Sequence, residues 1–249
     1  MQVGVISDIH GNNYALNAVL EDMPYVDTIV SLGDVVGYGP QPRMTADTIK
    51  SVASVSLRGN HETYLENPDH AAGNKGAHEG IKHARSELTD ELFEWLTSRP
   101  YRDVVADELG LAHGSPDPDN PFGYVKSSNI TELIPLLMEQ PYTVQAVGHT
   151  HLPFKQDLRK FEEEAGVVFN PGRVGQPRDG DPRAGYAVVD IDELPDNPVE
   201  AITLHRTPYD VDRAVQAINS IGLPEENGQR LETGSFPQQR TRRNNSPFN

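Results

Sequence analysis

Five short apolar segments of this sequence end near a glycine, and each is followed at once by Asp, Asn or His. The first runs from Val3 to Ile6 and is followed by Asp8 and His10. Side chains two residues apart on extended backbone point the same way, so this carboxylate and imidazole leave the strand together. In open α/β sheets, ligand-binding residues gather beyond the strand ends. The pattern therefore predicts an α/β fold in which five strand ends converge on one site.

The residues that follow these segments suit a pair of divalent metal ions. We assign one ion to Asp8, His10, Asp34 and His151, and the other to Asp34, Asn60, His113 and His149. The two oxygens of the Asp34 carboxylate allow it to bridge the ions. Imidazole and carboxylate ligands favour Mn, Fe, Co, Ni or Zn over Mg, which prefers octahedra of oxygen. Because the sequence has no cysteine, thiolate metal sites, thiol nucleophiles and disulfides are excluded.

Such a pair of ions is suited to phosphate chemistry. Two carboxylates and a hydroxide do not cancel the charge of two divalent ions, so the site stays positive and attracts a phosphate. Ions about 3.5–4 Å apart lower the pKa of a shared water and orient it for in-line attack on phosphorus. His61 is adjacent to the ligand Asn60 but is not needed to complete either metal shell. We therefore predict a hydroxide bridging the metals as nucleophile, His61 as general acid, and a catalytic role for Asp34.

The charge balance limits the partners that this chain can bind. Acidic residues outnumber basic ones by 37 to 21, and the formal net charge is -16. Binding to duplex nucleic acid needs a basic surface, so this class of partner is not expected. A small phosphorylated substrate is still expected, because bound metal ions reverse the field locally. The acidic, Lys-poor composition leaves two interpretations open, which are ordinary solubility and a halophilic surface that stays hydrated in high salt.

The length of 249 residues predicts one α/β domain with a C-terminal appendage. We place the predicted metal site in a domain at 1–222, with a helix at about 210–221 docked on it. The remaining segment, 223–249, is polar and is expected to be a largely disordered tail. No apolar run reaches the roughly 18 residues that a membrane span needs. The first residues lead straight into a strand without the features of a signal peptide, which predicts a cytoplasmic protein.

The order of the motifs resembles the calcineurin-like metallophosphoesterase family. The resemblance covers roughly residues 1–206 and rests on five blocks: Asp8-Ile9-His10, Gly33-Asp34, Gly59-Asn60-His61-Glu62, His113 and Gly148-His149-Thr150-His151. It implies a two-sheet β-sandwich flanked by helices, in four layers, with a dinuclear centre that hydrolyses phosphate monoesters or diesters. The loop 170–185 and the segment 37–40 are similar to the compact prokaryotic phosphodiesterase-type branch. Arg58 before Gly59 matches the protein phosphatases, which keeps that substrate class open.

These features predict a metal-dependent phosphoesterase, and a phosphodiesterase acting on a small substrate is the main hypothesis. The alternatives are a phosphomonoesterase, a protein phosphatase and a dinucleoside polyphosphate hydrolase. A non-catalytic scaffold, which the same fold forms in the eukaryotic retromer coat, is disfavoured because His61 and the full ligand set are present. Substrate contacts are expected from Arg173, Arg178, Arg183 and Tyr38. The sequence leaves open the oligomeric state and whether 64–75 and 116–124 form a lid.

Overall fold

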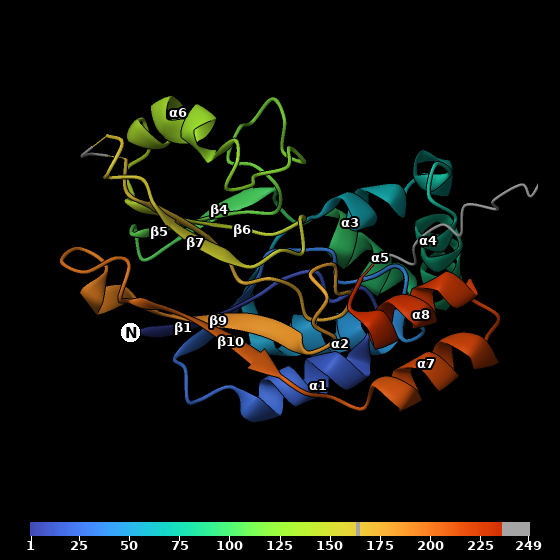
Figure 1. Cartoon of the computed structure of the whole chain (residues 1–249). Coiled ribbons are helices and arrows are strands. Elements are labelled where there is room, and N and C mark those ends of the chain that lie inside the picture. Colours follow the sequence, from blue (N-terminus) through green and yellow to red (C-terminus); the bar gives the residue numbers. More distant parts are fainter. Residues whose placement is uncertain (163–164, 236–249) are drawn as a thin grey trace, which may run out of the picture.

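Two five-stranded sheets stacked face to face form the centre of the molecule, described here from a computed structural model for residues 1–162 and 165–235 (Figure 1). The first sheet has the strand order β10-β9-β1-β2-β3. Its strands are β1 (Gln2–Ile6), β2 (Thr28–Ser31), β3 (Ala53–Ser56), β9 (Ala184–Asp190) and β10 (Ile202–Thr207). Because β1, β2 and β3 are parallel, the strand ends that precede Asp8, Asp34 and Asn60 lie at one edge of this sheet.

The second sheet has the strand order β4-β5-β6-β8-β7. Its strands are β4 (Arg102–Val105), β5 (Leu109–Ala112), β6 (Val144–Val147), β7 (Phe154–Asp157) and β8 (Val167–Asn170). The three central strands, β5, β6 and β8, are parallel, whereas β4 and β7 pair antiparallel at the two edges. The carboxyl ends of β5 and β6 lead into His113 and His149, so this sheet also delivers side chains from its strand ends.

Apolar side chains from alternate strand positions fill the space between the sheets. Val3 and Val5 of β1 belong to the same buried cluster as Leu111 and Phe169 of the second sheet. Ile6, on the other face of β1, packs in the cluster beneath the helices. β1 is therefore buried on both faces, as expected for a central strand of an α/β fold. This burial gives the residues that follow β1 a rigid support.

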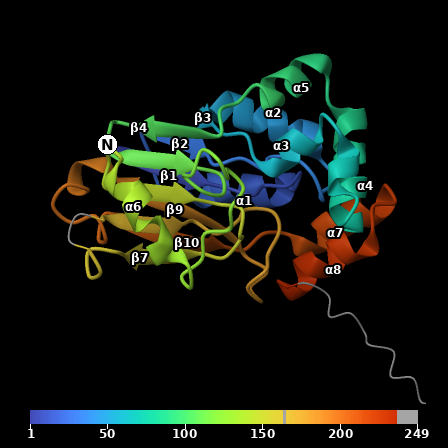
Figure 2. The ribbon, with the colours of Figure 1, turned by 90° about the horizontal axis from the view of Figure 1, so that it is seen from above.

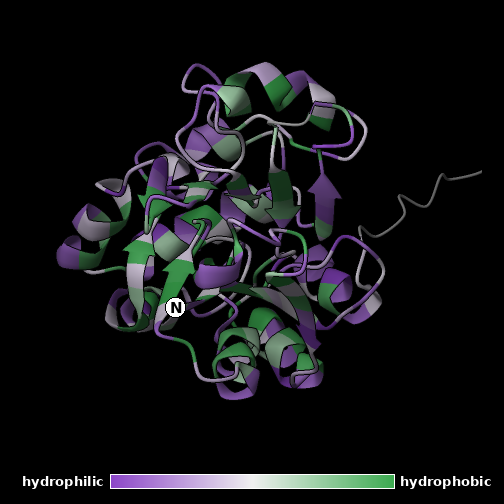
Figure 3. Cartoon of the chain, turned by 90° about the vertical axis from the view of Figure 1, so that its left-hand side faces the viewer, coloured by the Kyte–Doolittle hydropathy of each residue, from purple (hydrophilic) through white to green (hydrophobic). Residues whose placement is uncertain are grey.

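Helices cover both outer faces of the sandwich. The first sheet is covered by α1 (Asn13–Asp22) and α2 (Pro42–Val52), and α4 (Lys75–Glu87) and α5 (Asp90–Thr97) pack against α2. The second sheet is covered by η2 (Ile130–Leu133) and α6 (Ile134–Met138), at the top of Figure 1. Figure 3 shows that individual helices carry both hydrophobic and hydrophilic residues, as helices with one buried face do. The α/β sandwich of four layers expected from the sequence is confirmed.

Local signals in the sequence explain where several helices begin. The side chain of Asn12 accepts a hydrogen bond from the amide of Ala15 and caps α1, and Thr89 caps α5 in the same way. Pro42 occupies the first turn of α2, where its missing N–H costs nothing. Three further helical segments are short: α3 (Asn60–Tyr64), η1 (Pro68–Ala71) and η3 (Ile191–Glu193).

The C-terminal part of the described chain forms two helices, α7 (Val211–Ser220) and α8 (Glu225–Thr233). α7 packs on α1 and on α8, and Figure 2 shows both C-terminal helices beside α4 at one end of the sandwich. The expectation of a largely disordered tail from residue 223 was wrong for α8, because this polar helix buries Asn227, Arg230 and Leu231. Residues 236–249 of that expected tail lie outside the described residues.

Hydrogen bonds of Asn227 help to attach α8 to the body of the protein. The side-chain amide of Asn227 donates to the carbonyl of Tyr38 at 2.9 Å and to that of Gly76 at 3.2 Å. α8 therefore holds the loop that carries Tyr38 in place.

No helix among the described residues combines the length and the apolar character needed to cross a membrane, and the longest of them, α4, has 13 residues.

Candidate metal centre

The predicted ligands lie in tight turns directly after the strand ends, and these turns use left-handed backbone. The φ angles are 55° at Asp8, 52° at His10, 53° at Asp34, 63° at His149 and 61° at His151. This conformation costs roughly 1 kcal/mol or more for each residue with a side chain. Hydrogen bonds between the turns hold it, including one from the His10 amide to the Asp34 carbonyl at 2.9 Å. The turns thereby aim these side chains at one point.

Four predicted ligands form a fully buried group that we call the inner cluster: Asp8, His10, Asp34 and His151. Nε2 of His151 lies 3.1 Å from Oδ1 of Asp8 and 3.1 Å from Nε2 of His10. Nε2 of His10 lies 3.7 Å from Oδ2 of Asp34. One ligand atom from each residue falls within 4.8 Å of the others, a spacing compatible with donors around a single metal ion.

The imidazoles of the inner cluster are held in the tautomer that metal binding needs. Nδ1 of His10 lies 3.2 Å from the carbonyl of Val36, and Nδ1 of His151 lies 2.6 Å from the carbonyl of Gln176. A carbonyl oxygen only accepts, so both Nδ1 atoms carry a proton and the two Nε2 atoms present lone pairs. Burial lowers the pKa of both histidines, which keeps the rings neutral. The facing lone pairs repel each other, and a cation between them removes this repulsion.

Asp34 also belongs to a second group, the outer cluster, together with Asn60, His113 and His149. Nε2 of His113 lies 3.5 Å from Oδ2 of Asp34 and 3.3 Å from Oδ1 of Asn60, while its Nδ1 donates to the carbonyl of Leu32 at 2.8 Å. Although burial lowers the pKa of His113, the Asp34 carboxylate outweighs it and raises this pKa to about 9. The outer cluster therefore also attracts positive charge.

The carboxylate of Asp8 provides a test of whether these residues fit a metal ion. Its Oδ2 accepts hydrogen bonds from Ser7 Oγ at 2.7 Å and from the amide of His149 at 3.1 Å. Its Oδ1 is buried and accepts no hydrogen bond from the described residues, because the adjacent Nε2 of His151 carries a lone pair and no proton. A buried carboxylate oxygen without a donor is costly unless a cation binds it. The donor set of the two clusters therefore fits two divalent ions.

Glu62 positions the ligand turns without joining either cluster. Its carboxylate accepts hydrogen bonds from the amides of Gly59, Asp34 and Val35, each at 2.8 Å. Burial raises the pKa of Glu62 to about 7, and the charge of Asp34 adds to this effect. Gly59 must be a glycine, because a Cβ there would lie 2.1 Å from Oδ1 of Asp34. Glu62 thus fastens the turn after β2 to the start of α3 and sets the position of Asn60 relative to Asp34.

His61 lies beside both clusters but, within the described chain, belongs to neither. Its ring centroid is 4.5 Å from that of His10 and 4.8 Å from that of Tyr38, and its amide donates to Oδ1 of Asp34 at 2.9 Å. The ring packs against Gly37, where a Cβ would lie 2.0 Å from Nδ1 of His61. Burial lowers the pKa of His61 to about 4, so the ring is neutral in the metal-free protein. His61 is therefore a closely packed imidazole beside the two clusters.

A cavity of about 390 Å³ opens over the outer cluster. It is lined by Asp34, Asn60, His61 and His149. Residues of the two segments whose role the sequence left open line it as well. His70 and Asn74 line the cavity from the segment 64–75, and Phe122 lines it from the segment 116–124. Both segments therefore border the cavity over the outer cluster.

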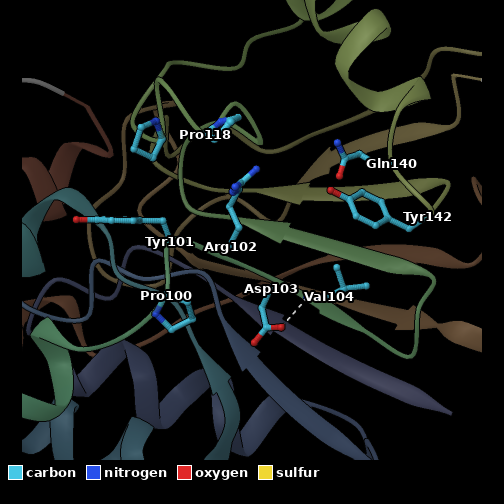
Figure 4. Close-up of a pocket in the computed structure, with 9 residues that line it drawn as sticks. Pro100, Tyr101, Arg102, Asp103, Val104, Pro118, Gln140 and Tyr142 are labelled. Atoms are coloured by element: carbon cyan, nitrogen blue, oxygen red, sulfur yellow. Dashed lines mark hydrogen bonds between the residues drawn. The ribbon is translucent and has the colours of Figure 1, made fainter.

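A larger cavity, of about 530 Å³, lies behind the segment 116–124 (Figure 4). It is lined by Tyr101 and Arg102 at the start of β4 and by Pro118 and Pro121 of that segment, and it contains none of the predicted ligands. Pro121 thus lines the larger cavity while its neighbour Phe122 lines the smaller one. Size does not identify the site here, because the convergent polar groups lie in the smaller cavity.

The four residues expected to contact substrate occupy different environments. Arg178 and Tyr38 line the cavity over the outer cluster. Arg173 is fully buried and pairs with Asp179 at 2.6 Å, and the exposed Arg183 pairs with Asp181 at 2.7 Å. Neither Arg173 nor Arg183 lines the cavity, because a local carboxylate holds each guanidinium within the loop. The structure thus brings Arg178 and Tyr38 to the metal centre and leaves the other two arginines in structural ion pairs.

Comparison with known proteins agrees with this architecture. A family model for the calcineurin-like phosphoesterase superfamily domain matches residues 1–194. A crystal structure of a metallophosphoesterase from Sphaerobacter thermophilus is similar with a TM-score of 0.78 and 32% sequence identity, covering 94% of this chain and 99% of that chain. A hypothetical protein from Pyrococcus horikoshii shares the fold, with a TM-score of 0.75, 21% identity and coverage of 95% and 99%.

A relative without an assigned function extends the similarity over nearly the whole chain. An uncharacterized protein of Methanocaldococcus jannaschii is 30% identical over 250 residues, which is 93% of this chain and 98% of that protein. The family match spans well over half of the chain and contains both clusters of buried ligands. From these matches and this geometry, we conclude that the chain belongs to the calcineurin-like phosphoesterase superfamily and is a metallophosphoesterase.

Proposed function

We propose that the protein hydrolyses a small phosphodiester, with His61 as the general acid. The observation that carries this proposal is the position of His61, a buried imidazole beside both clusters that binds neither. A histidine that only stabilised the fold would be expected to satisfy its ring nitrogens. Nδ1 of His61 instead has no hydrogen-bond partner among the described residues. An imidazole with a ring nitrogen that is not engaged in a hydrogen bond is suited to proton transfer at the cavity.

The residues of the two clusters would hold two divalent ions, drawn from Mn, Fe, Co, Ni and Zn. Bound there, the ions supply Lewis acidity and an activated water for attack on phosphorus. The protein supplies the geometry: Asp34 fixes the His61 backbone through the 2.9 Å hydrogen bond, and Gly37 leaves room for the ring. A phosphate anion beside His61 favours the protonated imidazole, which can then give its proton to the leaving oxygen. Arg178, on the cavity wall, is placed to orient the phosphate.

The lining of the cavity supports a diester over a monoester. Tyr64, Phe122 and Tyr124 also line it, which gives a second ester group a surface to contact. A monoester has no such group and carries more negative charge. Of the described residues that line the cavity, Arg178 is the only Lys or Arg, which suits the single charge of a diester.

The function is tested with the metal-reconstituted wild type and the His61→Asn variant. We expect hydrolysis of bis-p-nitrophenyl phosphate to exceed that of p-nitrophenyl phosphate. We expect His61→Asn to lower kcat by about 100-fold or more while metal analysis still finds both ions. The loss should be larger for a diester with an alkyl leaving group, because a poor leaving group depends more on protonation.

His78→Asn is the matched control, since His78 lies on α4 outside the cavity. It should leave kcat and metal content unchanged. A panel that adds a phosphopeptide and a dinucleoside polyphosphate separates the alternative substrate classes. Faster turnover of the monoester, the phosphopeptide or the dinucleotide would replace the diester assignment. A metal-loaded wild type that is inert toward the whole panel would contradict the catalytic proposal.

A further inference from the structure

The C-terminal helix α8 carries a buried charged side chain, Arg230, next to the metal centre. Arg230 is only 4% exposed, although the helix around it is polar. The central carbon of its guanidinium lies 5.5 Å from the centroid of the Tyr38 ring. Arginine is almost never buried to this extent unless its charged group has a partner. The position of this side chain therefore directs attention to what it does at Tyr38.

Tyr38 is held at its backbone and at its hydroxyl by different residues. The side chain of Asn227 donates to its carbonyl at 2.9 Å, and the side chain of Asn74 donates to its hydroxyl at 3.1 Å. Burial raises the pKa of this hydroxyl, whereas the charges of Arg178 and Arg230 and a hydrogen bond with Arg230 oppose the rise. Asn227 therefore fixes the backbone of Tyr38, and Arg230 acts on the far end of its ring.

The ring of Tyr38 packs in turn against the imidazole of His61. Their centroids are 4.8 Å apart, and the ring of His10 lies 4.5 Å from that of His61. The amide of His61 donates to Asp34, but Nδ1 of its ring has no hydrogen-bond partner among the described residues. The orientation of this imidazole therefore depends on the rings packed against it. A general acid misplaced by about 1 Å can lose a large part of its effect on the rate.

We propose that Arg230 is a positioning residue of the catalytic site, which holds the ring of Tyr38 against His61. This inference rests on the proposed function, because it takes His61 as the general acid. Arg230 is not among the residues that line the cavity, so it acts through Tyr38 and not on the substrate. A planar guanidinium with several donors is suited to fixing a hydroxyl in one place. A helix beyond residues 1–194, the part that matches the family model, thus contributes to catalysis.

The test measures kcat and KM of manganese-reconstituted variants for two diesters, bis-p-nitrophenyl phosphate and diphenyl phosphate. The second has the poorer leaving group and depends more on protonation. We expect Arg230→Met to lower kcat by about 5-fold for the first diester and by about 20-fold for the second, with little change in KM. Tyr38→Phe, which keeps the ring and removes the hydroxyl, should show the same pattern. In the His61→Asn background, Arg230→Met should lower kcat for bis-p-nitrophenyl phosphate no further.

Leu231→Ala is the matched control on the same helix, because Leu231 is buried against Ala214 and Ile218 of α7. It should lower the unfolding midpoint but leave the ratio of the two kcat values as in the wild type. A ratio that Arg230→Met also leaves unchanged would overturn the positioning role, because loosening of the helix alone affects both diesters alike.

Two further outcomes separate this inference from the proposed function. If Arg230→Met does not fold, Tyr38→Phe decides, and a wild-type ratio of kcat values in that variant overturns the positioning role. If His61→Asn is impaired but Arg230→Met is not, the proposed function stands and only the role of Arg230 is wrong. If His61→Asn keeps the wild-type kcat for both diesters, the general acid has been misassigned and both proposals fail.

Discussion

The two clusters share Asp34 but differ in how the protein encloses them. In the inner cluster, Asp8, His10 and His151 are at most 1% exposed, and two backbone carbonyls fix its imidazoles. In the outer cluster, Asn60 is 7% and His149 is 9% exposed, and both line the cavity. The inner cluster is thus closed by the fold, whereas the outer cluster is the side that a substrate can reach.

This difference indicates a division of labour between the two positions. A cation in the inner cluster meets ligands that are already oriented and shielded from water, so it should be held tightly. A cation in the outer cluster has a face toward the cavity, so it should exchange more readily and contact the phosphate. The ring of Tyr124 stacks on His149 and therefore belongs to the outer side as well.

The largest effect is expected from Asp34→Asn, which acts on both clusters at once. Oδ2 of Asp34 lies 3.7 Å from Nε2 of His10 and 3.5 Å from Nε2 of His113. Replacing this shared carboxylate by an amide removes the negative charge that both ions need. We expect metal content to fall from two ions per chain to one or fewer and kcat to fall by about 1,000-fold or more. Retention of two ions at full occupancy would contradict the bridging role.

A smaller and more selective effect is expected from comparing His151→Ala with His149→Ala. The first removes an inner ligand and leaves a buried void, so it should cost about 2 kcal/mol or more of stability together with the inner ion. The second removes an outer, partly exposed ligand and should release the outer ion with little loss of stability. Metal analysis and thermal unfolding of both variants measure the difference. Equal loss of stability in the two variants would erase the distinction between the clusters.

The smallest effect is expected from Asn227→Ala, which loosens the cover of the inner cluster without touching a ligand. Asn227 holds the carbonyl of Tyr38, and the ring of Tyr38 packs edge-on against His10 at 4.9 Å. Loss of this hydrogen bond should destabilise the protein by about 1–3 kcal/mol, measured by denaturant unfolding. Glu232→Ala on the exposed side of α8 is the control and should change stability far less. An unchanged unfolding midpoint for Asn227→Ala would show that α8 does not support the loop.

The sequence predicted the sandwich and the convergence of the ligands because both depend on local patterns. Strand ends in parallel sheets meet at one edge, so Asp8, Asp34 and His149 could be brought together from spacing and family resemblance alone. The helix caps and apolar strand runs are equally local. Their identification needed no knowledge of which side chains touch.

Features that depend on tertiary contacts were not predictable in this way. The carboxylate of Glu62 accepts hydrogen bonds from three amides because two turns distant in sequence meet at this one side chain. α8 looked like a polar tail because its buried residues include Asn227 and Arg230 rather than a clear apolar stripe. Arg173 and Arg178 lie in one loop. Only the fold shows that Arg173 forms an ion pair with Asp179.

The left-handed turns at the strand ends have a consequence for how this protein can change. Glycine would relax each of these positions, but it would also delete the side chain that the position exists to present. Selection for thermostability alone would therefore favour variants that have lost metal ligands, and with them activity, unless metal binding is selected as well. Ion binding also contributes to folding, because a cation stabilises the conformation in which these ligands converge.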